Sequence, residues 1–309
     1  MKLFQSIASF KSSKPTVVTI GTFDGVHLGH QKILEQIITE AKESNLESLV
    51  LTFFPHPRTV LQEGSEMKQL STIEEKIQLL TNIGIDNLII HPFDKTFSRL
   101  TAEEFVEQVL VNTFHIKKII IGYDHRFGRN RTATIEDLIS FGQKYNFEVI
   151  QISAKEINEV SISSTKIRNA LYEGDITLAN NLLGYIFSFS GKVVEGNKLG
   201  RTIGFPTANI QLDNEEKIIP LNGVYAVQLI VNQAIYNGMM NIGFRPTVDG
   251  KKRTIEVNIF DFEEDIYHQH VVVKLHRYIR SEVKFNGIDA LKEQLNRDRI
   301  RVKALLDKG

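Results

Sequence analysis

The first half of the chain alternates apolar, strand-like runs with segments of helical periodicity, and this alternation constrains the fold more than any other feature. The strand-like runs are residues 16–23, 48–54, 87–93, 116–124 and 147–153. Between them lie amphipathic patterns such as residues 71–84, which open with Ser-Thr, carry Glu74 and Glu75 in the first turn and end at a glycine. Repeated β-α units with short connections predict a parallel sheet covered by helices.

From about Tyr185 the pattern changes to strands with few helices. Within residues 223–231, Tyr225, Val227 and Leu229 alternate on one face, as in a β-strand. Further strand-like segments and a final amphipathic helix follow at residues 234–243, 254–262, 270–279 and 287–306. Several strands with a terminal helix predict a small antiparallel β-barrel. We therefore expect two domains, an α/β domain at 1–184 and a barrel domain at 185–309.

Charge and cysteine content narrow the classes of partner. The 309 residues include 37 Lys and Arg against 37 Asp and Glu, so net charge favours neither nucleic acid nor a membrane surface. The absence of cysteine excludes disulfides, thiolate metal sites and cysteine nucleophiles. No apolar run approaches the ~20 residues of a membrane helix, and no signal peptide is evident. We expect a cytoplasmic protein, with weak self-association left open.

The segment IGTFDGVHLGHQKILEQI, residues 20–37, places glycines and histidines where a strand meets a helix. A helix start offers free N–H groups and partial positive charge, which suit phosphate. Gly21, Gly25 and Gly29 let the backbone approach a ligand, and His27 and His30 add side-chain donors. A zinc site is a weaker alternative, because the spacing is not i,i+4 and no third ligand is obvious. A plain turn with incidental histidines also stays open.

A second helix start, SSTKIRNAL at residues 163–171, follows the fifth strand. Ser163, Ser164 and Thr165 offer hydroxyl groups and free amides, and Lys166 and Arg168 add positive charge. Taken alone, this segment is better explained by ordinary capping, because Ser and Thr are common at helix starts. Paired with the first segment, it predicts a second phosphate-binding helix start.

These motifs together resemble a known family. H-x-G-H after a first strand, with S-T-x-I-R late in the same domain, is similar to the nucleotidyltransferase superfamily. The segments GTFDGVHLGHQKIL, LTFFPHPRTVL, IIIGYDHRFGRNR and SISSTKIRNAL resemble the FAD synthetase half of the prokaryotic bifunctional riboflavin kinase/FAD synthetases. The resemblance spans nearly the whole chain. It implies a Rossmann-like nucleotidyltransferase domain at 1–184 and a riboflavin kinase domain at 185–309.

The segment GNKLGRTIGFPTANI, residues 196–210, carries the second candidate site. Its glycines, at 196, 200 and 204, form a flexible loop that also holds Lys198 and Arg201. Thr207 and Asn209 follow, and they point to the same side of an extended chain. Both are hard oxygen ligands suited to Mg²⁺ held with phosphates. On composition alone, a Gly-rich hairpin explains the segment equally well.

The same segment resembles the riboflavin kinase signature. That resemblance implies ATP contacts at Lys198, Gly200, Arg201 and Thr207, and Mg²⁺ ligands at Thr207 and Asn209. Glu256 lies in the strand TIEVNIFDF among apolar residues, where a lone carboxylate usually faces solvent. The resemblance instead makes Glu256 the proposed catalytic base.

The resemblance implies two ATP-dependent steps. Riboflavin is phosphorylated to FMN in the second domain, and FMN is adenylylated to FAD, with release of pyrophosphate, in the first. For the adenylyl step it assigns His27, His30 and Arg168 to the triphosphate. Its remaining ATP or phosphate contacts in that domain are Gly21, Phe23, Asp24, Gly29, Ser164 and Thr165. Its flavin contacts are Asp124, Arg126, Arg129, Tyr225, Asn241 and Arg280.

The chain departs from the family pattern near the expected flavin sites. Asn258 stands where His is frequent, His125 replaces a common aromatic residue, Thr132 replaces a frequent Gly, and His268 lies in an altered turn. Two alternatives follow: a monofunctional paralogue with one active site, or a non-catalytic flavin-binding regulator. Turnover with ATP distinguishes them, whereas flavin binding alone does not.

Overall fold

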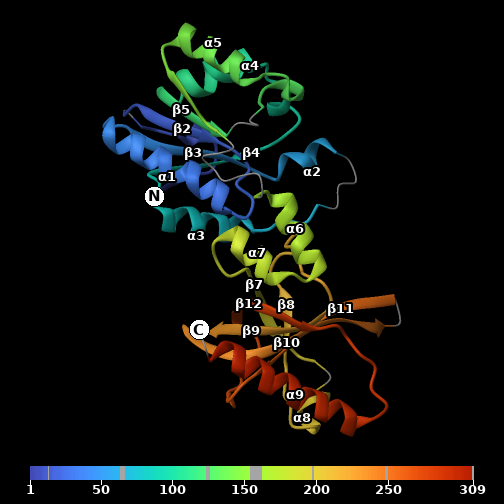
Figure 1. Ribbon diagram of the computed structural model, residues 1–309. Helices are drawn as coiled ribbons and strands as arrows, with labels where there is room; N and C mark the ends of the chain where they lie inside the picture. The colour runs from blue at the N-terminus through green and yellow to red at the C-terminus, as the bar shows by residue number, and fades with distance from the viewer. Residues whose placement is uncertain are drawn as a thin grey trace. The chain divides into compact units, whose positions relative to one another are not determined.

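The computed structural model describes residues 1–12, 14–62, 67–122, 126–153, 162–196, 198–247 and 250–307. Contacts between Cα atoms divide the chain into two compact units, unit 1 at Met1–Ser164 and unit 2 at Thr165–Gly309. Each unit contains its own β-sheet (Figure 1).

Unit 1 is built on a six-stranded parallel sheet with the strand order β1-β4-β3-β2-β5-β6. The strands are β1 (Lys2–Phe4), β2 (Thr16–Ile20), β3 (Glu47–Phe54), β4 (Asn87–Pro92), β5 (Ile116–Gly122) and β6 (Glu148–Ile152). The parallel arrangement confirms the prediction from the β-α alternation. The sequence did not predict β1, because three residues are too few to show a period.

Helices cover both faces of this sheet (Figure 1). The longer ones are α1 (Leu28–Glu43), α3 (Ile73–Ile83) and α5 (Ile135–Tyr145). The shorter segments are η1 (Ile7–Ser9), α2 (Pro57–Leu61), η2 (Phe97–Arg99), α4 (Ala102–Phe105), the π-helical η3 (Val106–Val111) and η4 (Arg129–Arg131). Local signals explain α3: Thr72 and Glu75 form a capping box at its start, and Gly84 ends it in the left-handed conformation.

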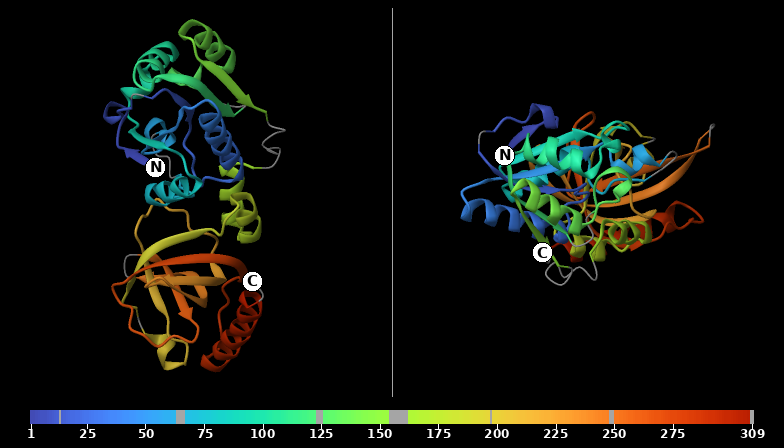
Figure 2. Two further views of the ribbon diagram at one scale, coloured as in Figure 1. Left: turned by 90° about the vertical axis from the view of Figure 1, so that its left-hand side faces the viewer. Right: turned by 90° about the horizontal axis from the view of Figure 1, so that it is seen from above.

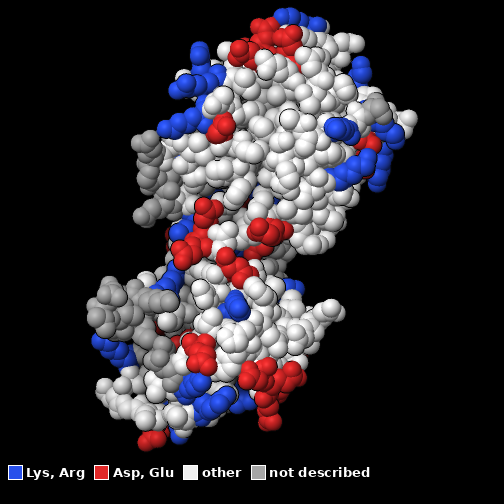
Figure 3. All heavy atoms as spheres, turned by 180° about the vertical axis from the view of Figure 1, so that it is seen from behind, with Lys and Arg blue, Asp and Glu red and all other residues white. Residues whose placement is uncertain are grey.

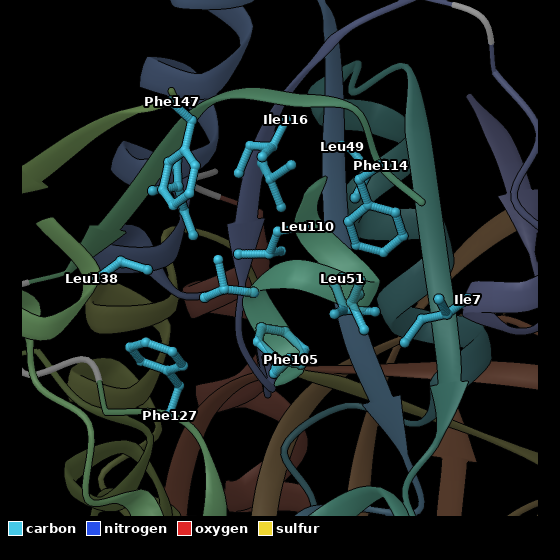
Figure 4. Close-up of a cluster of buried hydrophobic side chains, with 14 of the residues drawn as sticks. Ile7, Leu49, Leu51, Phe105, Leu110, Phe114, Ile116, Phe127, Leu138 and Phe147 are labelled. Carbon is cyan, nitrogen blue, oxygen red and sulfur yellow. The ribbon is translucent and has the colours of Figure 1, made fainter. Parts of the chain in front are cut away.

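Alternate residues of β3 supply the two apolar layers of unit 1. Val50 packs in a cluster with Leu34 of α1 and Leu80 of α3. Leu51 belongs to the larger cluster that Phe105 joins from the opposite face (Figure 4). Helices thus cover both faces of the sheet next to β3. The carboxyl ends of β2 and β3 are left for ligands, which parallel sheets bind at this end of their strands.

Unit 2 is a closed antiparallel barrel with the strand order β10-β11-β8-β7-β12-β9. Its strands are β7 (Ser188–Val194), β8 (Ala208–Leu212), β9 (Gly223–Val231), β10 (Ala234–Thr247), β11 (Gly250–Ile259) and β12 (His270–Arg280). The remaining helices are α6 (Ser164–Glu173), α7 (Ile176–Leu183), α8 (Leu199–Thr202) and α9 (Ile288–Leu306). The barrel and its terminal helix confirm the predicted fold class.

Helix α9 lies against the barrel (Figure 2). Val302 of this helix is fully buried, in a cluster with Val224 of β9, Met239 of β10 and Phe260, which directly follows β11. The apolar period predicted for residues 287–306 thus serves to cover one side of the barrel.

Helices α6 and α7 also hydrogen-bond within unit 2. The Leu221 backbone N–H donates to the Leu171 carbonyl at 3.0 Å. Asn180 donates from Nδ2 to the Leu275 carbonyl at 2.9 Å, and its Oδ1 accepts from the Phe187 N–H at 2.8 Å. The boundary between the two compact units therefore falls at the first residue of α6. The functional boundary expected at 184/185 stays a prediction.

Charged side chains of both signs are spread over the face of the molecule shown in Figure 3, on both units. This distribution agrees with the zero net charge of the sequence. Among the described residues, no helix combines the length and apolar character needed to cross a bilayer.

Candidate active sites

The loop between β2 and α1, residues 21–27, has an unusual backbone conformation. Phe23, Gly25 and Val26 all lie in the left-handed region, with φ of 46°, 78° and 37°. For a β-branched residue such as Val26 this conformation costs of the order of 1–3 kcal/mol, so surrounding contacts must hold it. The Phe23 and Val26 side chains are buried in the cluster shared with α1 and α3.

Buried hydrogen bonds tie this loop to the segment before α3. The Asp24 carboxylate, 1% exposed, accepts from the backbone N–H groups of Leu70 at 3.0 Å and Ser71 at 3.1 Å. The Ser71 hydroxyl in turn accepts from the Gly25 N–H at 3.0 Å. The Asp24 carbonyl oxygen accepts from the Ser164 hydroxyl at 3.1 Å. One residue therefore connects the first predicted phosphate motif to the start of the second.

His27 and His30 lie face to face at the start of α1. His27 caps the helix, because its Nδ1 accepts from the His30 backbone N–H at 3.3 Å. The two imidazole rings stack with centroids 3.6 Å apart, and Phe23 packs edge-on to His30 at 5.1 Å. The i,i+3 spacing thus stacks the rings instead of converging two nitrogens on a metal. Within the described part of the chain, no group of three His, Cys, Asp or Glu residues could hold a metal ion.

His30 carries an unused polar atom. Its Nδ1 is buried and has no hydrogen-bond partner among the described residues. Burial, followed by the neighbouring His27 and Lys76, lowers the pKa of His30 well below its usual value, so the ring is neutral at pH 7. A buried polar atom without a partner costs about 1–3 kcal/mol, and it marks a position suited to a ligand or a proton.

The other residues predicted for this site belong to unit 2, are exposed, or fall outside the described ranges. Thr165 and Arg168 belong to unit 2, where Thr165 is exposed and Arg168 is buried. Asp124 and His125 lie outside the described residues. Arg126 and Arg129 are exposed. The contributions of these residues stay predictions.

Three strands of the barrel bring the predicted kinase residues into one row. Glu256 of β11 is the register partner of Asn209 on β8 and of Asn241 on β10. Directly paired residues of neighbouring strands point to the same face of a sheet. Thr207, two positions before Asn209, places its hydroxyl 3.5 Å from Glu256 Oε2. The row therefore presents one carboxylate, one hydroxyl and two amides together.

Glycines bring the loop before β8 close to this row. A Cβ atom on Gly196 would lie 2.1 Å from Asn209 Nδ2, and one on Gly200 would lie 2.2 Å from the Phe205 carbonyl oxygen. Both positions thus exclude larger residues while the loop holds this conformation. Gly200 also approaches Thr207, whose Oγ1 would be 3.6 Å from that Cβ.

The two basic residues of this loop lie on its surface. Lys198, with φ of 58°, has its Nζ 3.7 Å from Glu195 and 5.6 Å from the centre of the Tyr267 ring. Arg201 is exposed within α8. Both side chains are placed where an incoming anion has access to them.

Comparison with known proteins covers both units. Residues 9–166 match the family model described as FAD synthetase, and residues 183–306 match the one described as riboflavin kinase. A bifunctional riboflavin kinase/FMN adenylyltransferase of Buchnera aphidicola is 42% identical over 307 residues, with 96% of each chain covered. The protein of that name from Escherichia coli K12 is 37% identical, with 97% of this chain and 96% of the relative covered.

The chain belongs to the bifunctional riboflavin kinase/FMN adenylyltransferase family. This confirms the family expected from the motifs, and with it the two transferase activities. A crystal structure described as a macrolide-efflux protein from Streptococcus pneumoniae shares the fold, with a TM-score of 0.90, 33% identity and 98% of each chain covered.

In this bifunctional enzyme, Tyr225 lies in the barrel core. The ring is fully buried, packs edge-on to Tyr278 with centroids 5.2 Å apart, and the hydroxyl donates to the Leu221 carbonyl. Burial raises the pKa of the Tyr225 hydroxyl far above its usual value. A direct flavin contact by Tyr225 stays a prediction.

Arg280, another predicted flavin contact, binds the terminal helix. Its Nε and Nη2 donate to Asp298 Oδ2 at 2.9 and 2.7 Å, and its Nη1 donates to the Ser281 carbonyl at 2.9 Å. Gln294 adds a third donor to Asp298 at 2.9 Å. The Arg280 and Asp298 side chains are 18% and 3% exposed, so this ion pair fastens α9 to β12. A flavin contact by Arg280 also stays a prediction.

Asn258, which departs from the family pattern, makes a hydrogen bond to the segment before β8. Its Nδ2 donates to the Pro206 carbonyl at 2.7 Å, and the residue is 7% exposed. Asn258 thereby positions the Pro-Thr-Ala-Asn segment from the neighbouring strand. Thr132 donates to the Arg129 carbonyl at 3.1 Å on the surface, and His268 is exposed.

Lys76 and Asp298 were not predicted from the sequence, although the sequence carries a signal for both. Lys76 lies on the apolar stripe of α3, three residues after Ile73 and four before Leu80. Asp298 lies on the corresponding stripe of α9, four residues before Val302. A charged residue at an apolar-stripe position indicates a buried ionic or hydrogen-bonded role.

Proposed function

We propose that this family member makes FAD from riboflavin in two steps, with unit 2 forming FMN and unit 1 converting FMN to FAD. Each step uses one ATP. The observation that carries the proposal is the row of Thr207, Asn209, Glu256 and Asn241 in the barrel, on a chain whose family match extends over both units.

In the kinase step, the terminal ribityl hydroxyl of riboflavin attacks the γ-phosphorus of ATP. A new O–P bond forms, the bond to the β,γ-bridging oxygen breaks, and ADP leaves. Glu256 orients the hydroxyl and accepts its proton, as the step requires of a base within reach. The Gly196–Gly204 loop, with Lys198 and Arg201, covers the nucleotide phosphates.

Thr207 and Asn209 fit a magnesium ion that is shared with the nucleotide. Their hydroxyl and amide oxygens are hard ligands, and the missing Cβ of Gly196 leaves room for the Asn209 amide beside the loop. When bound, Mg²⁺ would neutralise charge on the transferring phosphate. Few protein ligands are needed, since Mg²⁺ at such sites keeps waters and phosphate oxygens.

In the adenylyl step, a phosphate oxygen of FMN attacks the α-phosphorus of a second ATP, and pyrophosphate leaves. No covalent enzyme intermediate is needed, so positioning and charge stabilisation supply the catalysis. His27 and His30 contact the triphosphate at the start of α1, where free N–H groups point outward. Ser164, Thr165 and Arg168 contribute from the second motif, and the Gly21–Gly25 backbone lies against the phosphates.

The proposal keeps the functional domains expected from the sequence, at 1–184 and 185–309. The proposal includes the cytoplasmic location expected from the sequence. Weak self-association is a separate question, which sedimentation at several protein concentrations answers.

A product assay tests the proposal. The purified chain is incubated with riboflavin, ATP and Mg²⁺, and FMN and FAD are followed by chromatography. FMN that appears before FAD supports two working sites. FMN alone, or FAD only when FMN is supplied, indicates a monofunctional paralogue. Flavin binding without either product contradicts the proposal and favours a regulator.

A further inference from the structure

Lys76 of α3 is a buried charged residue next to the unit 1 loop. It is 4% exposed, and its Nζ donates to the Thr22 carbonyl oxygen at 2.7 Å. The same carbonyl accepts from the Thr52 hydroxyl at 3.2 Å. Lys76 therefore approaches the loop from inside the protein, one residue before the left-handed stretch that begins at Phe23.

Hydrogen bonds from Leu70, Ser71 and Lys76 converge on three residues of the loop. Leu70 and Ser71 bind the Asp24 carboxylate, Ser71 binds the Gly25 N–H, and Lys76 binds the Thr22 carbonyl. We name this set the loop clamp. The clamp holds the loop directly before His27, so any change in it changes where both histidines lie.

The charges around Lys76 are few and specific. Asp24 raises its pKa and burial lowers it, and burial dominates, so the pKa of Lys76 falls from 10.5 to about 8. Burial disfavours the charged form of His30 on α1, and the nearby His27 and Lys76 add to this effect. At pH 7 Lys76 is thus positively charged while His30 is neutral, and the lysine loses its charge as the pH rises through about 8.

We propose that Lys76 is a positioning residue for the adenylyl step, which fixes the loop before His27 and supplies a positive charge behind the triphosphate. The inference rests on the proposed adenylyl step of unit 1. Lys76 touches neither nucleotide nor flavin; it acts through the Thr22 carbonyl and through the position of the histidines.

Lys76→Met removes the charge and keeps the length of the side chain. We expect the kcat of FAD formation from FMN to fall about 10- to 100-fold with little change in the KM for ATP, because misplacement of about 1 Å can cost 10²-fold. The melting temperature should not fall, since a buried ammonium is removed and the Thr22 carbonyl keeps its bond from Thr52.

The pH dependence of FAD formation shows whether Lys76 acts through its charge or only through the packing of its side chain. In the unchanged enzyme, kcat/KM for FAD formation should decline on the alkaline side with a midpoint near the Lys76 pKa of about 8. In Lys76→Met this decline should be absent. In Lys76→Arg, which stays protonated, the activity should be partly restored and the decline should move beyond pH 9.

Two controls make the outcome decisive. Lys118→Met removes another lysine of unit 1, one whose Nζ binds Glu40 at 2.7 Å outside the clamp, and it should leave FAD formation unchanged. Ser71→Ala removes a neutral member of the clamp and should lower the kcat of FAD formation several-fold, so it tests the clamp even if Lys76→Met fails to fold. FMN formation by unit 2 is the internal control in every variant.

Suppose that the wild-type enzyme makes FAD. If Lys76→Met then makes FAD equally well, or keeps the alkaline decline, the role of Lys76 is overturned while the proposed function stands. Unchanged activity in Ser71→Ala together with an unfolded Lys76→Met would also overturn it. An unchanged enzyme that makes no FAD from FMN would instead contradict the proposed function.

Discussion

In unit 2 the candidate site is a row of strand neighbours, whereas in unit 1 it is a loop held by residues far away in the sequence. Glu256 meets Asn209 through the register of β8 and β11. Asp24 and Gly25 instead depend on Leu70 and Ser71, about 46 residues further along the chain. A β-ladder places side chains through its repeating geometry, but a left-handed loop needs buried contacts to hold it. The unit 1 site should therefore be more sensitive to changes outside the residues that contact substrate.

Replacing the carboxylate of the barrel row should give the largest effect. Glu256→Gln keeps the shape but cannot accept the ribityl proton, so FMN formation should fall about 10²- to 10⁴-fold. FAD formation from supplied FMN should be unchanged, because it needs only unit 1. Both rates are measured by chromatography on one protein preparation. Equal loss of both activities in a folded variant would show that the two sites are not separate.

Removing the stacked imidazole of unit 1 should give the next effect. His30→Ala should lower FAD formation about 10²- to 10³-fold, the range for loss of one group that stabilises a developing charge. FMN formation should persist. His115→Ala, at an exposed histidine directly before β5, is the matched control and should change neither rate. A His30→Ala variant that still makes FAD at the original rate would remove His30 from the site.

Breaking the Arg280–Asp298 pair tests whether the barrel site depends on α9. Asp298→Ala should lower the free energy of unfolding of unit 2 by about 3 kcal/mol, because it leaves a largely buried guanidinium without its carboxylate. Urea unfolding followed by circular dichroism measures this change. Glu293→Ala breaks an exposed pair of the same helix, with Arg297, and should have no measurable effect. If kinase activity is lost under conditions where the variant is still folded, Arg280 also contacts the flavin.

The smallest effect is expected at Asn258. Asn258→Ala leaves the Pro206 carbonyl without its amide donor, so the stability of unit 2 should fall by about 1 kcal/mol. The KM for ATP should rise modestly, since the Pro-Thr-Ala-Asn segment loses a support from β11. Thermal unfolding and initial rates measure the two quantities. No change in either would show that the strand register alone positions Thr207 and Asn209.

Much of the fold could be predicted, because periodicity reports directly on regular elements. The β-α alternation predicted the parallel sheet, and the strand-rich second half predicted the barrel. The short β1 gave no periodic signal, and it is a strand only because Asn87 and its neighbours on β4 pair with it. The packing of α6 and α7 within unit 2 depends on Asn180 and Leu221, whose partners lie far along the chain.

The candidate sites were predictable to the extent that residues near one another in sequence define them. Thr207 and Asn209 share a strand face, and His27 and His30 share a helix turn, so spacing alone brought each pair together. Thr207 and Glu256 are 49 positions apart, and only the family resemblance assigned both of them to one site. Neither residue spacing nor the family resemblance predicted a role for Lys76. Only the tertiary structure shows that this lysine on an apolar stripe reaches the Thr22 carbonyl.

The closed barrel limits where two copies of the chain can associate by pairing their β-strands. A closed sheet has no free hydrogen-bonding edge, whereas the open sheet of unit 1 ends at β1 and at β6. Strand β1 offers three residues and begins with a lysine, which discourages pairing. Among the described strands, β6, at Glu148–Ile152, is therefore the edge from which a foreign strand could extend the sheet. Such an extension would add chains at unit 1 and leave the hydrogen bonding of the barrel intact.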